Sequence, residues 1–478
     1  MRTPTLITPA GHPPVTRHRP PRPLAAVALA VLMSACAVQA PPLGERPTPA
    51  TLPAAWQAPA PEAGRTPVPD WLMSADPVLG GLLEAVQARS PGLQQAVARR
   101  DEVRALAGLS PGGPRVQGLA QVQRTRSVQP AGSPALTQAL AQVDASWEVD
   151  LFARVRQQSQ ALAQRADGAQ WELAAARLSL LVEVTQLYLA LRSGEQLQAL
   201  SIEEEQITER LAAQAAQRQR AGFETPAQQA LLAGAAAEAR QRRLAQQLEL
   251  DVMVKGLVAA TGLDEGALRQ RLATGQGRLP AWPALAVPAV PADALQQRPD
   301  LVAARAQAAA AWYESGAAQA ARYPQLQLLG SVSVLGVKLG GERDESRGWS
   351  FGPSLSVPLL DGGARRADAE AALARWRQAE AAWRLAATQA VREVEEALLR
   401  VAAQSARLEA AQASLASYDK ALKGTEQRWR HGLASASELD EQRRLTLAAR
   451  SQLLQLQREG LGAWLSLYKA VGGGFTPA

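Results

Sequence analysis

The only cysteine of the 478-residue chain, Cys36, carries its clearest chemistry. It ends the sequence Leu-Met-Ser-Ala-Cys at 32–36 and follows an apolar run, 24–35, which is too short for a permanent membrane helix but suits a secretory signal. Arginines precede this run and acids do not. The pattern predicts a lipoprotein signal peptide, 1–35, cleaved before Cys36, with lipid attached covalently to the thiol. The alternative is a small apolar residue in an ordinary cleaved leader.

Three carboxylates, Glu438, Asp440 and Glu441, lie close together late in the chain. Glu438 closes a capping box that starts at Ser435, and the other two carboxylates follow it, so one interpretation is a solvated helix start whose dipole favours negative charge. The other interpretation requires several copies of the chain. A carboxylate that faces a shared axis is then repeated around it, and such a ring binds or filters cations.

The residue set speaks against enzymatic chemistry. After cleavage His431 is the only histidine left, so no histidine cluster for a metal exists and a Ser-His nucleophile would depend on one turn residue. No P-loop pattern is present, and no basic stripe with interleaved aromatic residues suggests nucleic-acid binding. We expect no enzyme, no metal, no nucleic acid and no cofactor other than the lipid.

Four segments alternate apolar and polar residues like strands, at about 115–127, 136–149, 325–338 and 349–360. The charged residues 341–345 are expected to form the loop before the last strand. Polar strand residues expected to face water are Gln138, Gln142, Asp144, Ser354 and Ser356. The pattern also fits a half-buried soluble sheet, but a secreted, lipid-anchored chain favours a membrane barrel with its apolar face toward lipid.

Polar, alanine-rich helices are expected at 153–220 and 364–430, with return helices at 226–261 and 436–470. The first long helix would reach roughly 100 Å at 1.5 Å per residue, and such a helix needs partners along its length. A coiled-coil seam with polar breaks at Ser405 and Gln412 is predicted along Val394, Leu398, Val401, Ser405, Leu408, Gln412 and Leu415.

Strand-to-helix turns are expected at Asp150 and at Asp361, Gly362 and Gly363, where the aspartate accepts from free helix N–H groups and the glycines permit a tight turn. The two aspartates lie 211 positions apart, and other landmarks recur at nearly that offset. The chain is therefore interpreted as a tandem duplication. Helix-to-helix turns are expected around Arg220, Gly222 and Thr225 and, equivalently, Arg430, Gly432 and Ser435.

The expected organisation is a signal peptide at 1–35, a lipid-anchored leash at 36–76, repeat 1 at 77–262, an equatorial linker at 263–297, repeat 2 at 298–472, with its first helix at 299–322, and a tail at 473–478. Four strands cannot close a barrel, which needs at least about eight, so three copies giving twelve strands are expected. The predicted fold class is mainly α: a trimeric outer-membrane β-barrel that continues into a long periplasmic α-helical barrel.

Several motifs occur together in one order: the lipobox ending at Cys36, Trp147 to Phe152, Arg298 to Leu301, Val357 to Gly363, Glu426 to Arg430, Leu439 to Arg443 and Leu467 to Gly474. On these motifs the chain resembles the TolC-like outer-membrane efflux family, in its lipoprotein (NodT-type) branch. The resemblance implies a homotrimeric exit duct in the outer membrane, a periplasmic adaptor that contacts the helix-to-helix turns, and an inner-membrane pump, expected to be proton-driven and of the RND type. It also makes Asp440 the best candidate for a carboxylate ring at the gate.

Other classes remain open at this stage. The chain could be a structural trimeric coiled-coil surface lipoprotein that conducts nothing, or the exit duct of a type I protein secretion system. A lipid-anchored adaptor also uses helical hairpins, but it should have one hairpin and a soluble β module. The sequence does not identify the transported substrate, because a water-filled duct accepts the molecules that its pump delivers.

Overall fold

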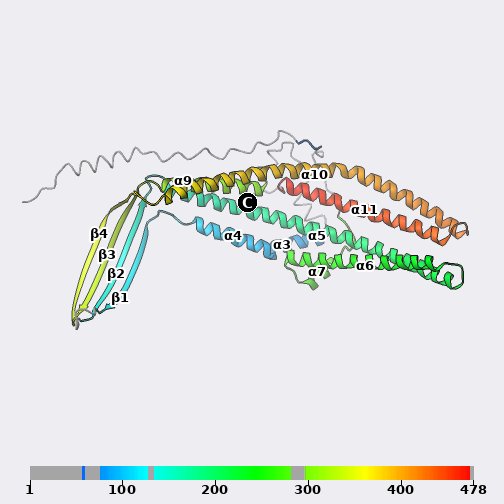
Figure 1. Ribbon diagram of the computed structural model, residues 1–478, viewed down its shortest axis with the longest axis horizontal. Helices are drawn as coiled ribbons and strands as arrows, with labels where there is room; N and C mark the ends of the chain where they lie inside the picture. The colour runs from blue at the N-terminus through cyan, green and yellow to red at the C-terminus, as the bar shows by residue number, and fades with distance from the viewer. Residues whose placement is uncertain (1–55, 60–75, 127–133, 281–294, 297, 474–478) are drawn as a thin grey trace, which may run out of the picture.

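Two 67-residue helices, α5 (Arg154–Arg220) and α10 (Ala364–Arg430), run along the molecule. In the computed structural model both leave a β-sheet at one end and turn back at the other, where α6 (Pro226–Thr261) and α11 (Ala436–Ala470) begin (Figure 1). The structure describes residues 56–59, 76–126, 134–280, 295–296 and 298–473. The predicted signal peptide, Cys36 and most of the leash lie outside these residues.

The sheet has four antiparallel strands in the order β1 (Arg115–Thr125), β2 (Leu136–Val149), β3 (Gln325–Leu339) and β4 (Glu342–Ser356). One hairpin comes from each half of the chain, and β2 pairs with β3 to join them. The edge strands β1 and β4 each have one neighbour. The sheet is therefore open on both sides.

The boundaries of the last strand differ from those expected from the sequence. The charged residues 341–345 were expected as a loop and the strand at about 349–360, but β4 begins at Glu342, opposite Leu339. Gly340 and Gly341 have φ of 59° and 102°, so two glycines suffice for the hairpin turn and the charged residues join the ladder. The strand ends at Ser356, shortly before the Asp361 turn that leads into α10.

Shorter helices pack on the long ones: α3 (Pro77–Arg89) and α7 (Glu265–Leu272) near their middle, and α4 (Pro91–Ala107) and α9 (Pro299–Ala320) between the middle and the sheet (Figure 1). Asp76 caps α3 through the N–H groups of Val78 and Leu79, and Asp264 caps α7 in the same way. Where α9 lies on α5, a Cβ on Gly168 would stand 3.4 Å from that of Ala306. Small residues thus let these helices approach closely.

The main apolar core forms a waist where α3, α5, α6, α7, α10 and α11 meet. Fully or almost fully buried members include Leu79, Leu82, Leu83, Tyr188, Leu257, Leu398, Trp464 and Leu465. The α5 helix is apolar enough over 18 residues to cross a membrane by composition alone, but many of its apolar residues lie in this core. Toward the hairpin ends no comparable cluster occurs among the described residues.

The two halves repeat one plan at an offset of about 210 residues. Gln246 of α6 donates to the carbonyl of Gly194 on α5, and Gln404 of α10 donates to the carbonyl of Leu456 on α11. Positions 194 and 404 correspond, as do 246 and 456, so the same crossing is bridged in both repeats with donor and acceptor helices exchanged. The described structure thus supports the tandem duplication.

Among the described residues Ala153 is the only non-glycine with positive φ, at 63°, and its counterpart at the start of α10 is Gly363, at 86°. Because a Cβ in this region costs about 1–2 kcal/mol, we expect Ala153→Gly to raise the free energy of unfolding by about 1 kcal/mol. The check is the thermal midpoint by circular dichroism. The control Ala381→Gly, within α10, should lower stability by about 1 kcal/mol. A lower midpoint for Ala153→Gly would contradict the assignment of strain.

Candidate channel wall, turns and periplasmic tips

The sheet separates its side chains by polarity. The large apolar strand residues that are exposed on one face are Val116, Val122, Val143, Trp147, Val332, Val334, Trp349, Phe351 and Leu355. Trp349 is 81% exposed and Phe351 74%. A soluble protein rarely leaves such a band uncovered, whereas a membrane barrel turns it toward lipid.

The opposite face is mainly polar. The strand pairing puts Gln138, Gln142, Asp144, Ser354 and Ser356, which were expected to face water, on this one face. Gln142 donates to Asp144 over 2.6 Å, and two serine hydroxyls, of residues 331 and 350, lie 2.8 Å apart across β3 and β4. Leu119, Leu329 and Leu339 are exposed exceptions on the same face. The face suits the wall of a water-filled channel.

The predicted strand-to-helix turns are capped by their aspartates. Asp150 accepts from the backbone N–H groups of residues 155 and 156, both over 3.0 Å. Asp361 accepts from those of Gly363 at 2.9 Å and Arg365 at 3.1 Å, and these two bonds hold the pKa of Asp361 below its ordinary value. Gly362 supplies a second positive φ, 65°. The sheet is thereby coupled directly to the helices.

The helix-to-helix turns lie at the far end from the sheet (Figure 1). In the first, Gly222 has φ of 80° and Thr225 accepts from the N–H of Gln228. In the second, Gly432 has φ of 74° and Ser435 accepts from the N–H of Glu438. The expected caps are thus present in both turns. Arg220 and Arg430 are exposed beside them.

Sequence reasoning missed the most exposed apolar residues of these turns. Phe223 is 76% exposed and Leu433 71%, and each follows the left-handed glycine. Their N–H groups close the helix ends by donating to the carbonyls of Arg218 at 2.8 Å and Arg428 at 2.7 Å. An apolar residue that follows a helix-ending glycine usually packs on its own helix. The sequence signal for this pair of exposed residues was therefore the apolar residue directly after each turn glycine. Phe223 and Leu433 therefore occupy equivalent positions at the two tips and are exposed for contact with a partner.

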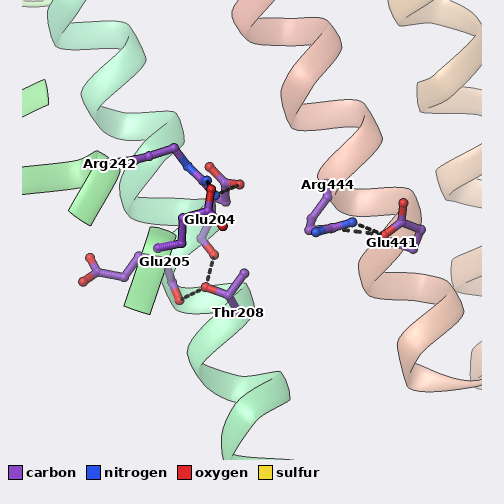
Figure 2. A network of polar contacts seen from close by, with 7 residues as sticks. Glu204, Glu205, Thr208, Arg242, Glu441 and Arg444 are labelled. Atoms are coloured by element: carbon purple, nitrogen blue, oxygen red, sulfur yellow. Dashed lines mark hydrogen bonds and ion pairs between the residues drawn. The ribbon is translucent and has the colours of Figure 1, made fainter. Parts of the chain in front are cut away.

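Each of the three candidate carboxylates has an arginine partner. Glu438 pairs with Arg428 over 2.7 Å, across the turn. Asp440 is only 7% exposed and pairs with Arg443 over 3.1 Å. Glu441 pairs with Arg444 one turn along α11, and Figure 2 shows this pair together with the Glu204–Arg242 pair of the other hairpin. The cluster therefore combines carboxylates with bound guanidinium groups.

Comparison with known proteins decides what this arrangement is. The sequence profile of the outer membrane efflux protein family matches residues 82–263 and 290–473, more than half of the chain. The chain belongs to the outer membrane efflux protein family. The two matched segments of this efflux protein coincide closely with its two structural repeats.

Individual relatives agree with the family. The outer membrane protein OprJ of Pseudomonas aeruginosa is 29% identical over 330 residues, which cover 69% of this chain and 68% of OprJ. Nodulation protein T of Rhizobium leguminosarum bv. viciae is 27% identical over 471 residues, covering 95% and 94%. The crystal structure of a membrane protein from Pseudomonas aeruginosa matches with a TM-score of 0.76 at 26% identity, over 91% of this chain and all of that one.

These findings confirm the predicted family and the predicted fold class, long helices continuous with a four-stranded antiparallel sheet. This efflux protein is an outer membrane channel of an efflux pump that extends into the periplasm, and not an enzyme.

The capping of Asp361 predicts a pH dependence. A carboxyl group with a depressed folded pKa stabilises the fold above its unfolded pKa, near 3.8, and this contribution is lost as pH falls through the folded value. We expect Asp361→Ala to lower the thermal midpoint at pH 7, with a gap that closes as the pH falls below about 4. Asp368→Ala, an exposed carboxylate in the same helix, serves as control. A gap that stays constant with pH would contradict the cap.

Proposed function

We propose that this efflux channel is a passive, trimeric exit duct. An inner-membrane transporter, joined to it through a periplasmic adaptor, delivers small molecules such as drugs and toxic compounds, which leave through the duct. The observation that carries the proposal is the open sheet with an apolar outer face and a polar inner face. Four strands cannot enclose a channel, and twelve from three copies can.

The helices support the same assembly. Leu244, Leu248 and Val252 form a stripe along α6 at intervals of four residues, and each is more than half exposed. In a trimer whose helices form a continuous tube wall, this stripe faces a helix of the next subunit. Sheet edges and helix flanks are then completed by the same neighbour.

The proposed partners meet the tips. The adaptor contacts Gly222, Thr225, Gly432 and Ser435 with their neighbours, where the exposed Phe223 and Leu433 offer apolar contact area. The pump is proposed to be proton-driven and of the RND type, on the resemblance to the lipoprotein branch. A conducting channel is favoured over a non-conducting stalk, because a stalk needs no sheet with one polar and one apolar face.

The lipid anchor on Cys36 is part of the proposal. The chain after it is held at the waist, where the N–H groups of Gln57 and Ala58 donate to the carboxylate of Glu395 over 2.7 and 2.8 Å. Ala58 is buried in the main core. The 20 residues from Cys36 to Trp56 can span at most about 70 Å, which is an upper limit on the distance between the anchor and this contact.

The assembly is tested by native mass spectrometry of the detergent-extracted protein and by single-channel recording. We expect a mass of three lipidated chains and stepwise ion conduction in planar bilayers. A stable, water-soluble monomer, or a trimer that never conducts even after its tips are removed by truncation of both hairpins, would refute the duct.

At the gate, Asp440 remains our candidate for a threefold carboxylate ring, together with Glu438 and Glu441. We expect Asp440→Lys to abolish the cation preference of the channel, because it replaces three carboxylates by three ammonium groups and separates Arg443 from its partner. Reversal potentials in a salt gradient measure the change. The control is Glu102→Lys on α4, remote from the tips. Unchanged selectivity would remove Asp440 from this role.

A further inference from the structure

A row of basic residues crosses the sheet close to its hairpin turns. The strand pairing places Arg124 opposite Thr137, Thr137 opposite Lys338, and Lys338 opposite Arg343. Paired residues of neighbouring strands project from the same face, so the four form one line across all four strands. The three basic side chains are exposed.

This basic row (Arg124, Lys338 and Arg343) lies on the apolar face. Arg343 and Trp349 are six residues apart on β4, and Lys338 and Val334 are four apart on β3, so each pair shares a face. The acidic Glu342 and Asp344 of the same strand alternate with these residues and project from the polar face. In the β3–β4 hairpin most basic side chains therefore project from the outward, apolar face, and most acidic side chains project from the polar face.

The three cations of the basic row are not neutralised by ion pairs to described residues. Within the described part of the chain, none of its three members has a carboxylate partner within 4.0 Å. Glu345 shares this face, but it pairs with Arg347 over 2.9 Å. The outward face thus presents three unneutralised cations per chain at one level.

The level of the row coincides with the edge of a bilayer. On β3 the apolar and small residues of the outward face run from Leu326 to Gly336, and Lys338 is the next residue on that face. Ten steps of about 3.3 Å give roughly 33 Å along the strand, or about 25 Å of height at a tilt near 40°. This is about the height of the apolar band of a membrane barrel. On β4 charges begin earlier on the same face, with the ion pair Arg347–Glu345 opposite Val334 and Gly336, so the basic row lies at the outer edge of the change from hydrocarbon to head groups.

A hollow of about 360 Å³ opens at the same place. On the outward face its lining comprises Thr137, the small residues Ala139 and Gly336, and the charged residues Lys338, Arg343 and Glu345. The hollow thus has a floor of small residues, and its outward rim carries two cations of the basic row and one carboxylate, Glu345, that Arg347 already pairs with. This combination fits an amphiphile with an anionic head better than a free ion.

We propose that the basic row binds the phosphate groups of phosphorylated glycolipids in the outer leaflet, with their acyl chains against the apolar band below. Guanidinium and ammonium groups pair strongly with phosphate, and a trimer presents nine such groups around its rim. The assignment rests on the proposed barrel, which sets the facing and height of the row.

The test uses the detergent-purified full-length channel and labelled lipopolysaccharide that carries both lipid A phosphates, with binding measured by thermophoresis. Each basic residue near a lipid surface contributes about a fivefold change in affinity, so the double variant K338Q/R343Q should bind about 25-fold more weakly. R375Q/R377Q removes two exposed arginines from α10 and should bind like the parent. Dephosphorylated lipopolysaccharide should bind the parent as weakly as intact lipopolysaccharide binds K338Q/R343Q.

Three results would overturn the proposal: equal binding by K338Q/R343Q and the parent, equal binding of dephosphorylated lipid, or full competition by soluble inositol hexakisphosphate at matched phosphate concentration. The last would make the row a site for soluble polyanions. Single-channel conductance of the same preparations distinguishes failure of the lipid-binding proposal from failure of the proposed exit duct. K338Q/R343Q should conduct like the parent. A parent that does not conduct even after truncation of both tips would refute the duct, and the lipid measurement on the intact protein would still decide the present proposal.

Discussion

An open sheet edge in a hydrocarbon environment is the constraint on which the structure depends. The outward face of the sheet is apolar, so the strands belong in the bilayer, where an unpaired backbone N–H or carbonyl costs several kcal/mol. Strand β1 has 11 residues and β4 has 15, and each has a free edge. The chain can meet this cost only by pairing with other strands. Its incompleteness as a monomer is thus a property of its backbone.

The waist has to hold the two repeats in one register so that the strands of both halves meet. Arg298, at the start of α9, is 6% exposed and donates to the carbonyl of Ala470 at the end of α11, over 3.0 Å. It also pairs with Asp300 and Glu393. Burial alone would lower the pKa of Arg298, but these two carboxylates outweigh it and raise that pKa. The guanidinium stays charged and joins the start of α9, α10 and the end of α11 at one point.

Much of this fold could be predicted because its signals are long and local. Two polar, alanine-rich helices of 67 residues, return helices capped by Thr225 and Ser435, and strands that mostly alternate apolar and polar residues leave few other assignments. The start of β4 was wrong because charged residues usually indicate a loop, whereas here the strand continues past the apolar band. The predicted coiled-coil seam of α10 was also wrong in part. Ser405 and Gln412, which were placed in the seam, are exposed, whereas the neighbouring Gln404 is buried. A heptad repeat of 3.5 residues drifts against a helix of 3.6 residues per turn.

The candidate site was less predictable because it depends on contacts between distant segments. The aspartate caps follow from sequence alone, and the structure shows both. The arginine partners of the carboxylates were missed, although Asp440 and Arg443 have the spacing of neighbours on a helix. The face of the sheet from which the basic row projects could be assigned only once the pairing register of all four strands was known. The lipid on Cys36 stays a prediction, since that residue lies outside the described part of the chain.

The distribution of contacts along the helices separates a rigid part from a more labile one. At the waist the hairpins are joined by buried leucines and by Trp464, which stacks on Tyr468 with ring centres 6.1 Å apart. Between the waist and the tip, α10 and α11 are joined by a few isolated buried leucines, such as Leu439 and Leu447, and by exposed ion pairs such as Arg450–Asp419 at 3.2 Å. Exposed ion pairs each contribute little and exchange readily with water. Local stability therefore falls from waist to tip, so a partner that binds the tips acts where the helices separate at least cost.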